Sequence, residues 1–566
     1  MDWTPSSVIR WLFDSRSGPT DRFLTRWIFL RALGVIYFSA FFPLVFQIRG
    51  LIGPQGILPA YEYLNNIASQ LGYSRYWYAP TLLWFSSTSH MLAALCWVGM
   101  LAAVLLVLNI WPRGMLAVCF LCFLSFVSAA GDFSGYQSDG MLLEAGFVAL
   151  FFAPPGFRPG LATARPASRA ALFLLVWEWF RIYFESGVAK MMGGDPEWRN
   201  FTALDDYYQN GPLPTWIGWY VAHLPHWFHA ATAAVTLGLE LFLIWAVFLP
   251  RRFRIILFFV VTPWQLGIIL TANYTFLNYL VLILGFLLLD DRFLERFLPA
   301  KWKALLPLQS SVEKVSPTSP AVDSQSILST APQKAEASTS GAKANSTGTG
   351  PPRDFWKTLQ TWLAPARVAI TAVLFAWLFY ATAVQMIWMV TPLSLPTAPV
   401  ALLEPFRIAN RYGLFAVMTR GRYEIEFQGS NDGQTWIAYP FRHKPQDIDK
   451  PPRIYAPYQP RLDWNLWFAS LGEWRDNPMV LRTERRLLSN DSDVLSLFAA
   501  NPFPQSPPRQ VRAVLWQYWF TSMQEKRAQG TWWRRQFLGL YAPAIELAPD
   551  GGIAVTQWPE PMPPHE

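Results

Sequence analysis

The chain has 566 residues, 52% of them apolar and only 15% charged, with a net charge of +8. Soluble proteins usually carry about 25% charged residues, so this composition argues against a soluble enzyme and favours a membrane protein. Its 29 tryptophans and 42 phenylalanines agree, because amphipathic rings collect at membrane–water interfaces, and its basic residues are too scattered to support a nucleic-acid partner.

Nine apolar stretches approach the roughly 20 residues that a helix needs to cross a bilayer. They are 27–46, 91–109, 114–130, 140–153, 171–187, 230–249, 255–272, 275–289 and 368–390. The fourth and the eighth are short, so the sequence predicts an α-helical polytopic membrane protein with eight or nine transmembrane helices. Residues 1–300 hold about eight of them, with longer outer loops at 48–90 and 188–229, and 356–395 hold the last.

Lysine and arginine distinguish the two sides of this predicted membrane domain. If the N-terminus is cytoplasmic, the same side receives most of the basic loop residues, which are Arg113, Arg158, Arg165, Arg169, Arg251, Arg252, Arg254, Arg292, Arg296, Lys301 and Lys303. The opposite loops 131–139 and 273–274 have none, and 188–229 has only Lys190 and Arg199. Because cytoplasmic loops carry an excess of positive charge, we expect this orientation at every crossing.

The last third of the chain changes character twice. Residues 308–350 are rich in Ser, Ala, Thr, Pro and Gly, which predicts a disordered cytoplasmic linker over 301–355. After the last span, "GRYEIEFQGSNDGQTWIAYPF" alternates apolar and polar residues around Asn431-Asp432-Gly433, a hairpin turn signal. "LLSNDSDVLSLFAANPF" predicts a helix that starts at an Asn/Asp/Ser cap and ends at Pro502. We therefore expect an extracytoplasmic, β-rich, sandwich-like domain over 396–566.

The residues that could hold a metal or a cofactor are poorly placed for it. Cys96, Cys119 and Cys122 all lie in apolar segments, where packing is the expected role. The three histidines of 223–229 recur at i, i+3 and i+6, a spacing that does not converge on one ion. The sequence predicts no metal site and no cofactor.

Several ionisable residues interrupt the apolar spans. They are Glu144, Glu178, Arg181 and Glu240, with Glu185 at the outer mouth of its helix beside Lys190. Charge inside a membrane is costly, so such groups face one another or a cavity, and Glu178 and Arg181, three residues apart, can pair. Two interpretations stay open: charges that neutralise each other and fix helix packing, or a polar cavity that opens to the outer face.

Several stretches together resemble the lipase maturation factor family. The first is "SGVAKMMGGDPEWRNFTALDDYYQNGPLPTWIGWYVAHLP", which contains Gly187, Lys190, Asp195, Trp198, Arg199 and Asp205. Others are "LIGPQGILPA", "YQSDGMLLEAGF", "ANYTFLNYL", "RIANRYGLFAVMTRGRYEIEFQG", "PYQPRLDWNLWFASL", "LLSNDSDVLSLFAANPF" and "WWRRQFLGLYAP". The similarity covers about residues 25–545 without the linker.

The resemblance implies a membrane protein of the endoplasmic reticulum that helps secreted clients, lipases in the family, to fold or assemble. A bacterial member would lie in the inner membrane, with its client domain in the periplasm. A client surface needs adaptable apolar and aromatic groups, for which Arg461, Asp463, Trp464 and Trp467 are candidates; core packing is their alternative role. The partners implied are a lipase-like client and the lipid bilayer, with the oligomeric state open.

The first stretch is also similar, more distantly, to the membrane domain of vitamin K-dependent γ-carboxylases. The matching residues are Gly187, Lys190, Asp195 and Trp198, and the resemblance implies an enzyme with Lys190 as a base. A lysine at an apolar mouth loses solvation, which makes its neutral form more accessible. A transporter built on the buried charges is a third hypothesis, although the chain shows no internal repeat of the kind many transporters have.

Overall fold

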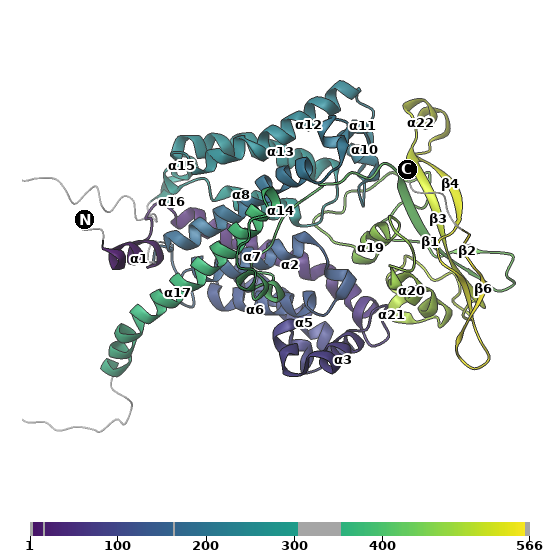
Figure 1. Cartoon of the computed structure of the whole chain (residues 1–566), viewed down its shortest axis with the longest axis horizontal. Coiled ribbons are helices and arrows are strands. Elements are labelled where there is room, and N and C mark those ends of the chain that lie inside the picture. The colour runs from purple at the N-terminus through teal and green to yellow at the C-terminus, as the bar shows by residue number, and fades with distance from the viewer. Residues whose placement is uncertain (1–3, 15–16, 162–164, 304–352, 561–566) are drawn as a thin grey trace, which may run out of the picture.

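Helices make up the first part of the chain and an antiparallel sheet lies near its end (Figure 1). The structure, a computed structural model, describes residues 4–14, 17–161, 165–303 and 353–560. The helical part and the sheet lie at opposite ends of the molecule, with α19 (Arg461–Ala469), α20 (Pro478–Leu488) and α21 (Ser492–Leu495) between them (Figure 1). Most of the predicted linker lies outside the described residues.

All nine predicted spans coincide with helices. These are α2 (Phe23–Ile52), α5 (Ser89–Val107), α6 (Pro112–Val127), α7 (Gln137–Phe152), α8 (Arg169–Met192), α12 (His226–Leu241) with η5 (Leu243–Phe248), α13 (Arg251–Thr271), α14 (Leu277–Phe286) and α17 (Arg353–Val390). Five segments of the described chain are long and apolar enough to cross a membrane: α2, α5, α12 with η5, α13 and residues 365–390 of α17. The structure thus shows a helical membrane domain with five candidate spans, and eight or nine remains a prediction.

Short helices connect the long ones at both ends of the helical domain. The extra helices before and after the spans are α1 (Pro5–Phe13), α15 (Asp291–Leu294), η6 (Glu295–Phe297) and α16 (Ala300–Lys303). The predicted outer loop 48–90 contains α3 (Ala60–Leu71), η2 (Gly72–Ser74), α4 (Arg75–Tyr78) and η3 (Leu82–Trp84). The loop 131–139 begins with η4 (Gly131–Ser134), and the stretch 188–229 contains α9 (Pro196–Arg199), α10 (Ala203–Asn210) and α11 (Trp216–Ala222).

The C-terminal domain is built on one six-stranded antiparallel sheet. Its strands are β1 (Arg422–Ser430), β2 (Ile437–Ala438), β3 (Gln510–Phe520), β4 (Trp533–Leu540), β5 (Ala544–Leu547) and β6 (Ile553–Gln557). They lie in the order β2-β1-β3-β5-β6. β4 and β5 share one edge of β3: β5 pairs with its first two residues and β4 with residues 514–520. The remaining short helices are α18 (Ala398–Ala401), η7 (Glu404–Phe406) and α22 (Met523–Gln529).

The expected sandwich is wrong, because the described residues contain this single sheet and no second one facing it. The apolar face of the sheet, with Ile425 and Phe427, is instead covered by α19 and α20. A period-2 pattern shows that one face of a strand is buried, but it does not show whether strands or helices bury it. The tight packing joins both halves, since one hydrophobic core contains Phe29 of α2, Leu466 of α19 and Ile425.

The predicted hairpin is confirmed. β1 and β2 pair through Gln428↔Ala438 and Gly429↔Ile437, and Gly433 in the turn has φ +74°. The carboxylate of Asp432 accepts the backbone N–H groups of Gln434 and Thr435 at 2.8 and 2.7 Å, which lowers its pKa below its usual value of 3.8.

The predicted helix in 487–503 is capped by Asp491 as expected, but it is only α21 and ends well before Pro502.

Candidate functional site

An irregular segment, residues 407–421, passes from η7 to β1 along the helical domain, and we call it the strap. Its backbone and side chains contact α7, α8 and the loop that follows α8. Ser186 Oγ accepts the N–H of Leu414 at 3.2 Å, and Gln137 Oε1 accepts the N–H of Gly413 at 3.1 Å. The strap therefore fastens the last domain to the membrane helices through specific polar contacts.

The first half of the strap covers the buried charges of α7 and α8. Glu144 Oε2 accepts the backbone N–H of Asn410 at 3.0 Å, its Nδ2–H at 3.1 Å and the hydroxyl of Tyr412 at 2.9 Å. Arg181 forms an ion pair with Glu144 and donates to the carbonyl oxygen of Asn410 at 2.7 Å. Glu185 accepts the backbone N–H of Tyr412 at 2.7 Å. Each of these carboxylates takes hydrogen bonds from a segment more than 200 residues further along the chain.

This geometry bears on both interpretations of the intramembrane charges. Arg181 pairs with Glu144 and, at 3.7 Å, with Glu185, whereas Glu178 accepts the hydroxyl of Tyr412 at 3.5 Å and a backbone hydrogen bond from Ala145. The guanidinium is thus directed toward α7 rather than along α8 to Glu178. All four groups, one guanidinium and three carboxyl groups, are buried beneath the strap, so the contacts are those of a closed packing cluster and not of a cavity open to the outer face.

Lys190, near the C-terminal end of α8, is fully engaged. Its ammonium donates to both carboxylate oxygens of Glu240, at 2.9 and 2.8 Å, and to the carbonyl oxygen of Leu414 at 3.0 Å. The ring of Trp198 lies 5.0 Å from Nζ. Each of its three N–H groups thus has an acceptor. The contacts are those of a structural ion pair between α8 and α12, and they do not favour the role of a base.

The other residues of the family stretch also hold the strap or the local turns. Asp195 caps α9 and accepts the N–H of Met418 at 2.6 Å, and the indole of Trp198 donates to the carbonyl oxygen of Phe415 at 2.8 Å. Arg199 donates to the carbonyl oxygen of Met191 at 2.6 Å, and Asp205 lies 2.9 Å from the imidazole of His226. In the segment after α8, Asp195 and Trp198 therefore bind the strap, whereas Arg199 and Asp205 make local contacts.

The three histidines do not form a metal site. His223 lies between the carbonyl oxygens of Trp219, at 2.7 Å, and Thr521, at 2.9 Å, and so links α11 to the end of β3. His229 is buried beside Tyr208, apart from His226. Across the described residues no group of three or more potential metal-ligating side chains is found.

The four proposed client-contact residues of α19 are all buried. Arg461 donates to Asp139 of α7 at 2.8 and 3.0 Å and to the carbonyl oxygen of Phe133 at 2.6 Å. Asp463 accepts the N–H groups of His443 and Lys444, and its burial raises the pKa of its carboxyl above the usual value. Trp464 and Trp467 pack inside the domain. A client could reach them only if α19 left its place, so their contacts are those of the alternative role, packing.

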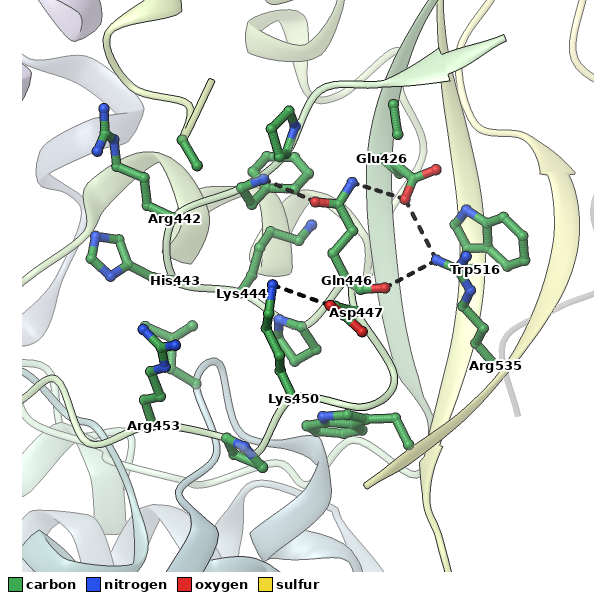
Figure 2. A pocket seen from close by; sticks show the side chains of 18 of the residues that line it. Glu426, Arg442, His443, Lys444, Gln446, Asp447, Lys450, Arg453, Trp516 and Arg535 are labelled. Atoms are coloured by element: carbon green, nitrogen blue, oxygen red, sulfur yellow. Dashed lines mark hydrogen bonds and ion pairs between the residues drawn. The ribbon is translucent and has the colours of Figure 1, made fainter. Parts of the chain in front are cut away.

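A pocket of about 700 Å³ lies on the polar face of the sheet (Figure 2). Its floor is formed by Glu426 and Gln428 of β1, Trp516 of β3 and Arg535 of β4, which the strand pairing places on one face. Residues 440–455 form the opposite wall, and Leu213 and Pro214, between α10 and α11, close one side. The pocket is therefore built from both domains, a common location for binding sites.

Hydrogen bonds fix the wall that faces the sheet. Gln446 donates to Glu426 at 3.0 Å and accepts the N–H of Phe441 at 2.9 Å. Further along, Asn273, in the loop between α13 and α14, accepts the N–H of Tyr455 at 2.7 Å and donates to the carbonyl oxygen of Arg453 at 2.8 Å. Sequence patterns give no sign of the pocket, because its parts, from Leu213 to Arg535, are as much as 322 residues apart and no single part has a distinctive pattern.

Together these observations define a membrane protein of several spans whose sheet domain is fixed to the helices by a strap and shares a pocket with them. The lipase maturation factor transmembrane domain matches residues 24–296, and the lipase maturation factor C-terminal domain matches residues 408–543. The chain belongs to the lipase maturation factor family. The strap lies almost entirely within the second matched region.

Relatives match over nearly their whole length. The chain is 30% identical to lipase maturation factor 1 of Bos taurus over 557 residues, 95% of this chain and 92% of that protein. It is 31% identical to lipase maturation factor 2 of Homo sapiens over 604 residues, 93% of this chain and 83% of that protein. No solved structure matches the chain.

Proposed function

We propose that this protein assists the folding or assembly of a secreted, lipase-like client protein at the luminal or periplasmic face of a membrane. The relatives are named for lipase maturation, and the match extends over both domains. The observation that carries the proposal is that the two domains are fixed to each other. The strap and α19 hold the sheet, with its preformed pocket, against the membrane helices. Such a unit can keep an emerging client close to the membrane.

The proposed orientation keeps the basic loops in the cytoplasm and the sheet domain on the other side. In Figure 1, α1, α15 and α16, which adjoin basic residues, lie at the end of the helical domain opposite the sheet. Arg22 and Arg251 are at that end too, since Arg22 donates to the carbonyl oxygen of Leu287 at 2.7 Å and Arg251 pairs with Asp290. Positive charge at one end and the sheet domain at the other agree with the positive-inside rule.

The function is tested by recovery of a defined client. A homodimeric lipase from the same organism is expressed with the full-length chain, without it, or with a chain that ends before the strap. We expect secreted lipase activity per unit of lipase protein to require the full chain. Equal specific activity in all three cultures would reject the proposal, and a reporter fused after residue 560 that proves cytoplasmic would reject the orientation.

A further inference from the structure

Resting on the proposed function, we propose that the pocket of about 700 Å³ between the sheet and residues 440–455 binds a short, extended, acidic peptide segment of the client. The size lies within the range of 300–1,000 Å³ typical of ligand pockets. The chemistry of the lining decides between possible ligands.

The charges of the lining favour an anionic partner. Lys444, Lys450 and Arg535 have carboxylate partners: Glu424 at 2.8 Å, Asp447 at 3.1 Å and Glu426 at 3.6 Å. Within the described part of the chain, no carboxylate lies within 4.0 Å of the charged nitrogens of the other two cations, Arg442 and Arg453. Both are exposed, so they keep their positive charge for a ligand.

The two arginines without a carboxylate partner are placed together, and Arg442 also donates to the carbonyl oxygen of Ser496 at 3.1 Å. Figure 2 shows Arg442 and Arg453 along one side of the pocket with His443 between them, whereas Glu426, Trp516 and Arg535 lie on the side of the sheet. Burial lowers the pKa of His443 below its usual value of 6.5, although Asp463 opposes that shift, so near neutral pH it adds no charge of its own. One wall therefore attracts carboxylates, and the opposite wall already balances its charges.

The remaining lining favours a peptide over a lipid or a bare anion. Apart from prolines, the lining residues with aliphatic side chains are Leu213, Ala438 and Ala499, too few to form a channel for an acyl chain. Aromatic rings and prolines form the rest of its apolar lining, including Trp436, Tyr455 and Trp516, and rigid apolar surfaces of this kind pack against peptide side chains. The fixed wall lowers the entropy cost of binding, because little of it must order.

Binding is measured by isothermal titration calorimetry on the purified full-length chain in nanodiscs. Three peptides of equal length are compared: one with Glu and Asp between aromatic residues, one with Gln and Asn in their place, and one with Lys. We expect the acidic peptide to bind at least about tenfold more tightly than the neutral one, and its affinity to fall as salt is added.

The variant R442E/R453E tests the site, and R527E is the matched control. Arg527, in α22, is an exposed arginine of the same domain that does not line the pocket. We expect the double variant to lose acidic-peptide binding by about tenfold or more and R527E to retain it. Equal binding of acidic and neutral peptides, or equal loss in R527E, would overturn the inference.

Two further ligands separate other sources of negative charge. Inorganic phosphate that binds while no peptide does would overturn the inference in favour of a small-anion site. Binding that depends on phosphatidylglycerol in the nanodiscs, and not on added peptide, would overturn it in favour of lipid headgroups.

The client assay then separates failure of the peptide site from failure of the proposed function. If the full chain promotes lipase recovery and R442E/R453E does so equally, the peptide site is rejected and the maturation function stands. If removal of the chain leaves recovery unchanged, the function is rejected whatever the peptide does.

Discussion

The guanidinium of Arg461, in α19, makes two hydrogen bonds to the carboxylate of Asp139, in α7, at 2.8 and 3.0 Å. Both side chains are fully buried, and the pair joins the C-terminal domain to a helix of the membrane domain. A buried pair of this kind fixes how two parts meet more than it adds net stability, because both charges lose their hydration.

Removing one partner of this pair leaves the other charge buried without compensation. We expect R461M to destabilise the protein by about 3–5 kcal/mol, and R461M combined with D139L to recover much of that loss. The thermal unfolding midpoint of the purified chain in detergent measures both effects. The control is R475M, at an exposed arginine in the loop after α19. A double variant no more stable than R461M would show that the pair is not the cause.

The ion pair of Lys190 and Glu240 allows a test of whether Lys190 has a structural or a catalytic role. K190M leaves the buried carboxylate of Glu240 unpaired, so we expect little folded protein, with a loss of about 3–5 kcal/mol. Adding E240L removes that carboxylate and should restore folding and lipase recovery together. If Lys190 were a catalytic base, the double variant would fold and remain inactive. Size-exclusion chromatography of the detergent extract and the client assay give the two readouts.

Gly187 of α8 marks a close approach of two membrane helices. A Cβ atom added there would lie 2.9 Å from Cβ of Glu240 and 2.9 Å from Cδ2 of Leu241, both in α12. We expect G187A to push the helices apart and to cost about 1–3 kcal/mol.

G238A is the matched control for that substitution, because a Cβ on Gly238 of α12 would meet nothing within 4 Å. Alanine there should leave stability unchanged or raise it by up to about 1 kcal/mol, since it favours the helix. Thermal unfolding of both variants in detergent checks the difference. Equal midpoints for G187A and the parent chain would show that the two helices tolerate a wider separation.

The helices were the most predictable part of this fold. Every predicted span is a helix, because a run of apolar residues of that length has few other ways to satisfy its backbone. The hairpin at Asp432 was also predictable, since its turn residues act locally. The prediction of a sandwich was wrong because α19 covers the apolar face of the sheet. The sequence of α19 is rich in aromatic residues, but it does not indicate which surface the helix packs against.

The site was predictable in its residues but not in its contacts. Glu144 and Arg181 stand out in the sequence because charge in an apolar helix is costly, and Lys190 stands out at the outer mouth of its helix, yet the sequence does not identify most of their partners. Several partners lie in the strap, whose residues Asn410 and Tyr412 act through backbone groups and a phenol in an irregular conformation. No periodicity indicates such a segment, and only the fold shows that it crosses the ends of the helices.

The sheet domain should show a pH dependence that originates in one carboxyl. Glu484 of α20 is fully buried, and burial raises the pKa of its carboxyl well above the usual 4.5. The folded state therefore holds a proton more tightly than the unfolded state, so the contribution of this group is complete below pH 4.5 and is lost as pH rises toward its folded pKa.

E484Q keeps the shape and removes the titration. We expect the variant to have a higher unfolding midpoint than the parent chain at pH 7 and the difference to shrink as pH falls from 7 toward about 4.5, below which both side chains are uncharged in the folded and the unfolded state. Thermal unfolding of the full chain in detergent between pH 4 and pH 8 measures the difference. E473Q, at an exposed glutamate nearby, should show no such trend. A constant offset between E484Q and the parent at all pH values would contradict the assignment.

Because of the strap, the hydrogen bonds of the buried carboxylates in the membrane domain form only after a much later part of the chain has been translated. Glu144 is synthesised 266 residues before Asn410, the residue whose backbone and side chain satisfy it. A polypeptide that terminates after α8 and before residue 407 would keep the pairs of Arg181 with Glu144 and Glu185 but lack the hydrogen bonds that the strap donates to both carboxylates. Surveillance proteases that recognise exposed charge among membrane helices could then sort incomplete chains from complete ones, so a premature stop far from the helices would remove the whole protein and not merely its tail.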